Sequence, residues 1–464
     1  MMKHLLKQHP RVEALARKLI SIYPLSARLG SPFWNWYAFL EESETWSPSQ
    51  LLEYQFQQLR TLLQRLAKNS PFYAKRMGDL KIETVRSLAD LQSALPPVSR
   101  KEFAANFHDI QSREFRQKEC YSSATSGTTG SPLQFFHRKE NRMREWAAIC
   151  HQWKRVGYDP VRSRRAEFRG LTRQGSLFQD FPEQNMVRMS ILALRAENLP
   201  RMAEVIRSRQ VDFFHGYPSA IYLLAQTVQR SGIRFPQPKS ILLASEMVYD
   251  FQLEQIQAAF PSSKLFAHYG CAECTVLGAW CEHRRVYHIL PQYSIVEADA
   301  SNGEILGTNL YNDVNGFVRY RMTDAAGGVE TSPCSACQRP YVPIVTGLDG
   351  RQEDYLYSPE IGWIAPAIVT YPLKHLHDIT ELQFVQETPS SLILNYALRP
   401  GTTADMATKE LDEIETGLRG LIGNSIALTT IQVDEIPRGP TGKYKWIVSR
   451  LDPASIGSDL KRQK

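Results

Sequence analysis

Short apolar runs alternate with amphipathic segments through the middle of the chain. Residues 211–214, 241–244 and 265–268 are apolar runs, and helix-patterned segments follow at 220–229 and in the stretch that reaches Phe260. Buried parallel strands read as continuous apolar runs, and the helices that join them cover the faces of the sheet. The pattern predicts an α/β fold with a large parallel or mixed sheet layered with helices.

Polar residues follow each of these runs. His215-Gly216-Tyr217-Pro218 comes after the first run, and Ser219 is predicted to cap the next helix. Glu246 follows the second run, and Glu273 lies shortly after the third. Because ligands of such sheets bind beyond the carboxyl ends of the strands, we expect His215, Glu246 and Glu273 to gather there.

The N-terminal segment, residues 1–80, is predicted to be helical. Apolar residues recur on one face of a helix from Ser47 to Asn69, and a second amphipathic helix is expected near the N-terminus, where the repeating residues are Val12, Leu15, Leu19 and Ile20. We expect this second apolar face to pack on the body of the protein. Attachment to a membrane surface is the alternative.

The pattern becomes β-rich after about residue 290. Asn302-Gly303 and Asn315-Gly316 predict hairpin turns. The C-terminal residues then predict a small α+β unit: a hairpin over 382–398 that turns at 389–391, a helix over 405–421 and a strand over 426–433. We therefore expect an N-terminal domain over 1–350 with a β-rich subdomain, a hinge over 351–354, and a small, mobile C-terminal domain over 355–464.

Composition limits the class of protein. The 464 residues are 43% hydrophobic and 22% charged, as in globular proteins, and the net charge of +7 fits anionic ligands without arguing for nucleic acid. Seven irregularly spaced cysteines and no recognisable signal sequence favour the reducing cytoplasm. No apolar run is long enough to predict a transmembrane segment. A monomer and a homodimer are both compatible with the sequence.

Residues 121–132 read YSSATSGTTGSP and are the most informative segment. Glycines let backbone N–H groups converge on an anion, and Ser and Thr hydroxyls add donors to phosphate oxygens. A flexible Ser/Gly linker explains the composition equally well. The segment alone therefore leaves phosphate binding and a linker open.

Four further motifs follow in order. Together with residues 121–132 they resemble the motifs of the adenylate-forming superfamily, and five in order are hard to obtain by chance. The motifs are YGCAE (269–273), YRMTD (320–324), GRQED (350–354) and PRGPTGK (437–443).

The resemblance implies a role for each matching residue. Glu273 would hold Mg²⁺, Lys443 would be catalytic, and Glu353 would lie in the hinge. ATP or AMP would contact Ser126, Gly127, Thr128, Thr129, Gly130, Glu246, Tyr269, Gly270, Asp324 and Arg351. His215 and Tyr217 are candidates for the acyl pocket, with core packing as the alternative.

Within the superfamily the chain resembles the phenylacetate–CoA ligase and CapK (coenzyme F390 synthetase-like) branch, through Trp46-Ser47-Pro48 and residues 69–73 and 215–219. The resemblance implies that ATP activates a small carboxylic acid as acyl-AMP, which is then transferred to CoA. Residues 355–362 lack the Lys/Gly-rich character expected of a CoA ligase. A CapK-like transfer to an amine of an amino sugar or amino acid, as in polysaccharide biosynthesis, is therefore the alternative. A non-catalytic nucleotide-binding protein of the same fold is the second alternative.

Cysteine spacing adds a predicted zinc site. Cys334 and Cys337 have the spacing of half a structural site, and Cys281 with His288 supplies another half, with His283 as a rival ligand. Some members of the resembled branch have a similar layout and bind zinc there, so the resemblance implies a zinc site here. Free thiols in a tight turn are the alternative.

A basic run has two interpretations. Its members, which could hold the phosphates of CoA or an anionic acceptor, are Arg162, Arg164, Arg165, Arg169 and Arg173. A solvated surface face is the interpretation that such a charge run favours.

Overall fold

A computed structural model describes most of the chain. The described residues are 10–124, 133–169, 176–299, 303–329, 334–340, 343–349, 355–364, 369, 376, 378–399, 401–437 and 446–451.

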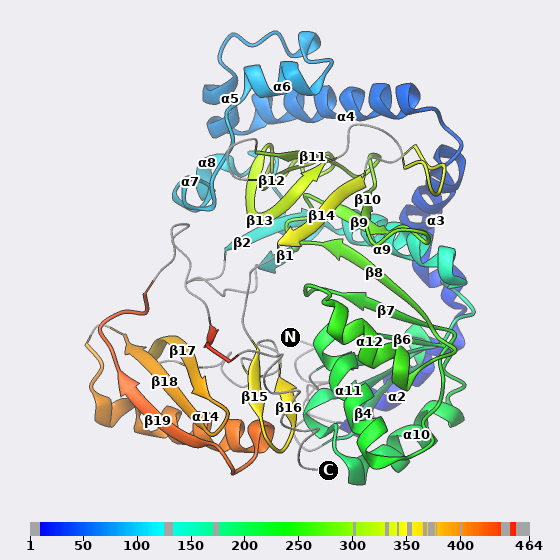
Figure 1. Cartoon of the computed structure of the whole chain (residues 1–464). Helices are drawn as coiled ribbons and strands as arrows, with labels where there is room; N and C mark the ends of the chain where they lie inside the picture. The colour runs from blue at the N-terminus through cyan, green and yellow to red at the C-terminus, as the bar shows by residue number, and fades with distance from the viewer. Residues whose placement is uncertain are drawn as a thin grey trace.

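Helices dominate the N-terminal region (Figure 1). The predicted helix is α4 (Pro48–Asn69): Ser47 Oγ accepts from Gln50 N at 3.3 Å, and the Gln50 side chain accepts from Ser47 N at 2.9 Å. Its leucine face is buried. The other helices here are α2 (Pro10–Ile22), α3 (Leu25–Ser43), α5 (Pro71–Met77), η1 (Ile82–Thr84), α6 (Leu88–Ala94), α7 (Arg100–Ala105), α8 (Phe107–Ile110) and η2 (Gln117–Glu119).

The apolar face of α2 is exposed. Val12, Leu15, Leu19 and Ile20 are 52–59% accessible, so the expected packing of this face on the body of the protein is wrong for the described residues. The opposite face of α2 makes the contact instead, because Arg17 pairs with Glu183. Among the described helices, none has the length and apolar character needed to cross a bilayer.

A sheet of twelve strands organises the middle of the molecule. Its central strands β8, β7, β6, β3 and β5 are parallel, and its two ends are antiparallel, which confirms the predicted mixed α/β class. In spatial order the strands are β11 (Ser294–Ala298), β12 (Glu304–Asn309), β13 (Tyr320–Val329), β14 (Pro343–Asp349), β10 (Tyr287–Ile289), β9 (Leu277–Trp280), β8 (Lys264–Gly270), β7 (Ser240–Ala244), β6 (Phe213–Gly216), β3 (Arg165–Arg169), β5 (Met186–Ser190) and β4 (Phe178–Phe181).

Helices cover the parallel part of this sheet, as the sequence predicts. Ser219 is not the cap of α11, because the helix begins one residue earlier, at Pro218, and the N–H of Ser219 bonds to Glu246 instead. The elements are α9 (Lys139–Trp153), η3 (Lys154–Val156), η4 (Pro182–Gln184), η5 (Ile191–Ala193), η6 (Ala196–Asn198), α10 (Leu199–Ser208), α11 (Pro218–Ser231) and α12 (Asp250–Ala259).

The two Asn-Gly pairs behave differently. Gly303 has a φ of 71° and lies in the turn between β11 and β12, as predicted for a hairpin. Asn315-Gly316 instead lies inside the longer connection from β12 to β13, and its glycine has no positive φ. A Cβ atom at Gly316 would lie 2.5 Å from Leu66 Cδ1, so this glycine serves close packing against α4 rather than a turn.

The C-terminal region is the predicted α+β unit. A four-stranded sheet in the order β19-β18-β17-β20 packs with α14, and residues of both join the largest apolar core of the molecule. Arg230 Nη1 donates to Ile361 O at 2.7 Å, which links α11 to the hairpin that precedes this sheet. The elements are β15 (Leu356–Ser358), β16 (Gly362–Ile364), β17 (Ile379–Thr388), β18 (Ser391–Leu398), α14 (Ala404–Ile422), β19 (Ala427–Gln432) and β20 (Ile447–Ser449).

Candidate active site

Three of the predicted site loops lie side by side at the carboxyl edge of the parallel strands. Register pairs Gly216 of β6 with Leu243 of β7, and Ala244 of β7 with His268 of β8, so the loops that leave these strands are neighbours. The Glu246 carboxylate accepts the N–H of Ser219 at 3.1 Å in the first turn of α11. Glu246 therefore ties the β7 loop to a helix N-terminus, where negative charge is favourable.

A hydrogen bond joins two of the motifs. Tyr269 Oη donates to Asp324 Oδ2 at 2.8 Å, although the two residues come from different strands, β8 and β13. Burial, followed by the nearby Asp324 carboxylate, raises the pKa of Tyr269 well above its usual value. Tyr269 is therefore a neutral donor that fixes the orientation of Asp324.

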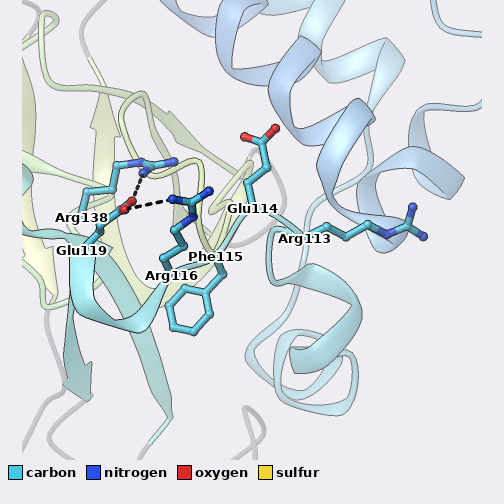
Figure 2. Close-up of a pocket in the computed structure, with 6 residues that line it drawn as sticks. All are labelled: Arg113, Glu114, Phe115, Arg116, Glu119 and Arg138. Carbon is cyan, nitrogen blue, oxygen red and sulfur yellow. Dashed lines mark ion pairs between the residues drawn. The ribbon is translucent and has the colours of Figure 1, made fainter.

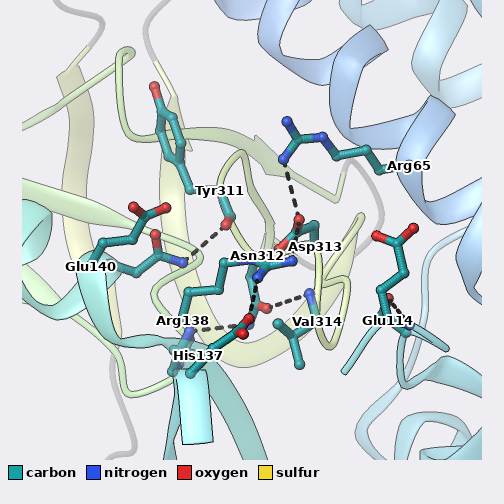
Figure 3. Close-up of polar contacts among 12 residues, drawn as sticks. Arg65, Glu114, His137, Arg138, Glu140, Tyr311, Asn312, Asp313 and Val314 are labelled. Carbon is teal, nitrogen blue, oxygen red and sulfur yellow. Dashed lines mark hydrogen bonds and ion pairs between the residues drawn. The ribbon is translucent and has the colours of Figure 1, made fainter. Parts of the chain in front are cut away.

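Two side chains hold the turn that carries Glu273 by bonding to its backbone carbonyl groups. His137 Nε2 lies 3.1 Å from the carbonyl oxygen of Ala272, and Asn309 Nδ2 donates to the carbonyl of Glu273 at 3.2 Å. Asn312 lies on the other side of the imidazole, 3.1 Å from His137 Nδ1 (Figure 3). Burial lowers the pKa of His137 to about 4, so the ring is neutral.

His137 also anchors the hairpin that flanks the predicted phosphate segment. It belongs to β2 (Gln134–Arg138), which pairs with β1 (Cys120–Ala124) up to Ala124 and Gln134. The strands on both sides of residues 125–132 are thus fixed next to the Glu273 turn. Sequence reasoning did not single out His137 or Asn309, because a lone imidazole or amide in a strand has no motif.

Several predicted residues lie outside the described part of the chain. They are Ser126, Gly127, Thr128, Thr129, Gly130, Arg351, Glu353 and Lys443.

The candidate acyl-pocket residues lie beside an aromatic ring and an arginine. His215 is 7% accessible, and its ring lies edge-on to Trp153 with centroids 4.9 Å apart. The guanidinium carbon of Arg169 lies 5.2 Å from the centre of the Tyr217 ring. The two candidates are therefore next to a cation as well as to aromatic side chains.

The predicted cysteine and histidine ligands come together. Ligand atoms of Cys281, His288, Cys334 and Cys337 all lie within 4.8 Å of one another, and all but Cys337 are buried. His283, the rival ligand, is not in this group. A tetrahedral zinc ion with bonds of about 2.0–2.3 Å fits three sulfurs and one imidazole nitrogen so arranged.

Two surface depressions lie away from these loops. One, of about 410 Å³, is lined by Arg113, Arg116 and Arg138 with two glutamates and Phe115 (Figure 2), and a neighbouring one of about 500 Å³ shares Arg138. Arg138 Nε donates to Asp313 Oδ1 at 2.7 Å, and Arg65 pairs with the same carboxylate (Figure 3). Asp313 pairs with both of these arginines, and Glu119 lies 3.8 Å from both Arg116 and Arg138, so these arginines are already ion-paired within the protein.

Comparison with known proteins gives two kinds of match. Residues 356–450 match the family model of the CapK C-terminal domain. Among solved structures, a 2-hydroxyisobutyryl-CoA ligase in complex with 2-HIB-AMP and CoA has a TM-score of 0.57 at 16% identity, covering 91% of this chain and 94% of that chain. The same ligase in the postadenylation state with R3-HIB-AMP has a TM-score of 0.55 at 16% identity, with the same coverage. No curated protein matches the sequence significantly.

These matches define the fold. The chain has the fold of these 2-hydroxyisobutyryl-CoA ligase structures, in agreement with the predicted fold class. Its residues 356–450 are similar to the C-terminal domain of CapK.

Proposed function

We propose that the protein is an ATP-dependent ligase that converts a small carboxylic acid to its acyl-AMP and releases pyrophosphate. The observation that carries this proposal is the hydrogen bond from Tyr269 to Asp324, because it joins two motifs that resemble nucleotide-binding elements of the adenylate-forming superfamily. Glu246 and Glu273 belong to loops of the same edge.

The residue types fit the chemistry of adenylation. A carboxylate that attacks the α-phosphate of ATP brings two anions together, so the barrier is largely electrostatic. Glu273 would hold Mg²⁺, which supplies positive charge to the phosphate oxygens. Asp324 and Arg351 would bind the ribose, residues 126–130 would donate to the phosphates, and the Lys443 ammonium would offset charge in the transition state.

Two acceptors remain for the second step. Transfer to CoA is the leading proposal, and the similar 2-hydroxyisobutyryl-CoA ligase structure contains both an acyl-AMP and CoA. Transfer to an amine is the alternative, favoured by the match to the CapK C-terminal domain and by residues 355–362, which contain no lysine.

The test is ATP–pyrophosphate exchange with a panel of carboxylic acids, followed by identification of the product with CoA or with amines. We expect exchange with a subset of acids, and Lys443→Ala to lower the rate by two orders of magnitude or more, from a loss of about 3 kcal/mol of transition-state stabilisation. Lys239→Ala is the control, because Lys239 is an exposed lysine paired with Asp212. Exchange that no acid supports would refute the ligase.

We also propose that Cys281, His288, Cys334 and Cys337 hold a structural zinc ion. The ion would stabilise the fold by cross-linking β10 and the residue after β9 to residues 334–340.

A further inference from the structure

Part of the basic run in the sequence is buried. Arg165, Glu167 and Arg169 alternate along β3, so their side chains share one face of the sheet, and Arg165 and Glu167 are only 7–8% accessible. The expectation of a solvated face is therefore wrong for Arg165, and Arg169 is only partly exposed. Helix α9 covers this face, because Trp146 lies against Arg165 and Trp153 against His215.

Among the described residues, the layer of side chains between this face of the sheet and α9 holds more positive than negative charge. Glu167 is aligned with Arg188 of β5 and with His215 of β6 in the parallel register. Arg188 Nη2 lies 2.6 Å from the Glu167 carboxylate, and Arg169 Nε lies 3.5 Å from it. Arg188 and Arg169 thus share one carboxylate. The third guanidinium group, that of Arg165, donates instead to the Tyr158 hydroxyl at 3.0 Å and to the carbonyl oxygen of Gln184 at 3.3 Å. An excess of cations over anions is costly where the side chains are partly removed from water, so the excess among the described residues indicates a missing anion.

Two side chains of this layer have unused hydrogen-bonding capacity. Neither ring nitrogen of His215 has a hydrogen-bond partner among the described residues, although the residue is more than nine-tenths buried. Burial, followed by the charge of Arg169, holds the pKa of His215 well below its usual value, so the ring is neutral with one N–H to donate. Arg169 Nε also has no hydrogen-bond partner in the part of the chain that the structure describes, and the Arg169 side chain is 35% accessible.

The open end of the layer faces the proposed site. Arg169 ends β3 at the carboxyl edge and lies over Tyr217, which directly precedes the helix tied to Glu246. A ligand that enters from the motif loops would meet Arg169 first and His215 behind it.

We infer that Arg169 and His215 bind a second anionic group, of carboxylate size, on the acid that the enzyme activates. This inference rests on the proposed adenylation. The guanidinium fork matches a carboxylate in two parallel hydrogen bonds, and the neutral imidazole adds a donor without adding charge. The substrate class is therefore a dicarboxylic acid, whose far carboxylate neutralises the excess cations while its near carboxylate reacts with ATP.

The experiment compares malonate, succinate, glutarate and adipate, each beside its monoamide, in ATP–pyrophosphate exchange. The amide keeps the size and removes the charge. We expect one diacid to exceed its monoamide by roughly ten- to 150-fold in kcat/KM, the range of a hydrogen bond to a charged group. Arg169→Gln should reduce this preference to a fewfold. Arg162→Gln is the matched control, since Arg162 belongs to the same basic run and is exposed.

A binding measurement separates the two hypotheses. Calorimetric titration of the same diacid into wild type and Arg169→Gln measures the affinity of the proposed anion site even where no exchange occurs. Arg169→Lys keeps the charge but loses the planar guanidinium, so it should bind the diacid with intermediate affinity. Diacid binding lost in Arg169→Gln without any exchange would refute the adenylation and retain the site. Equal rates and affinities for diacids and monoamides in the wild type would overturn the site, and exchange with other acids would then leave the adenylation standing.

Discussion

Removal of the Tyr269 hydroxyl is the most direct test of the hydrogen bond between Tyr269 and Asp324 in the proposed nucleotide site. Tyr269→Phe keeps the ring in place and deletes one donor, at 2.8 Å from the Asp324 carboxylate. A hydrogen bond to a charged group contributes about 1.5–3 kcal/mol. If Asp324 needs this donor to hold its orientation toward the ribose, the loss raises the KM for ATP by roughly ten- to 150-fold.

The assay is ATP–pyrophosphate exchange at a saturating concentration of the acid, with varied ATP. Because the pKa of Tyr269 lies well above its usual value, the hydroxyl stays protonated, and the ratio of variant to wild-type KM should be constant from about pH 6 to 9. Tyr287→Phe is the matched control, since its ring lies 6.0 Å from that of Tyr269 and its pKa is likewise raised by burial.

A double-mutant cycle gives the refuting result. In an Asp324→Asn background, Tyr269→Phe should have a much smaller effect on KM than in the wild type, because the charged acceptor is already gone. A KM that Tyr269→Phe changes by less than twofold in a folded protein, or effects that simply add in the cycle, would refute the coupling of the two motifs.

Three further predictions concern the rest of the molecule. Purified protein should contain about one zinc ion per chain by metal analysis. Cys337→Ser should lower this zinc content, whereas Cys120→Ser, outside the cluster, should not. Absence of zinc together with freely alkylated thiols would exclude the site. Glu297→Ala should lower the free energy of unfolding in urea by about 3–5 kcal/mol, because it leaves the buried Arg319 without its carboxylate. Glu387→Ala, which breaks an exposed pair with Arg450, is the control and should cost under about 1 kcal/mol. The pKa of His137 is lowered to about 4 in the folded chain, so the stability that its neutral form contributes is present above about pH 6.5 and is lost as the pH falls toward 4, by up to about 1.4 kcal/mol per pH unit. His137→Gln should lack this pH-dependent part of the free energy of unfolding. Identical pH dependences of unfolding in the variant and the wild type would contradict the assignment.

The sequence predicted those helices and strands whose buried residues form a recognisable pattern over a few neighbouring positions. Continuous apolar runs such as 241–244 became central strands because both faces of a parallel sheet are covered. The same reasoning failed where tertiary context decides. The apolar face of α2, including Leu15, has the pattern of a buried helix and is nevertheless exposed. Arg165 has the charge of a surface residue and is nevertheless buried, since an aromatic helix face covers its strand.

The candidate site was predictable only in part, for a related reason. Motifs located Tyr269 and Asp324 but not the bond between them, which joins strands that are distant in the sequence. The support of the Glu273 turn by His137 involves a separation of 135 residues, over which no local pattern extends. The candidate site residues belong to recognisable sequence motifs, whereas the residues that orient them do not.

Strand β8 has neighbours that run in opposite senses, parallel β7 on one side and antiparallel β9 on the other. Its alignment is therefore set twice, by two different ladders of backbone hydrogen bonds. A slip of a single residue along either ladder would rotate the Tyr269 side chain to the opposite face and separate its hydroxyl from Asp324. Alternative pairings of this strand during folding would thus yield a compact protein without the hydrogen bond on which the proposed nucleotide site depends.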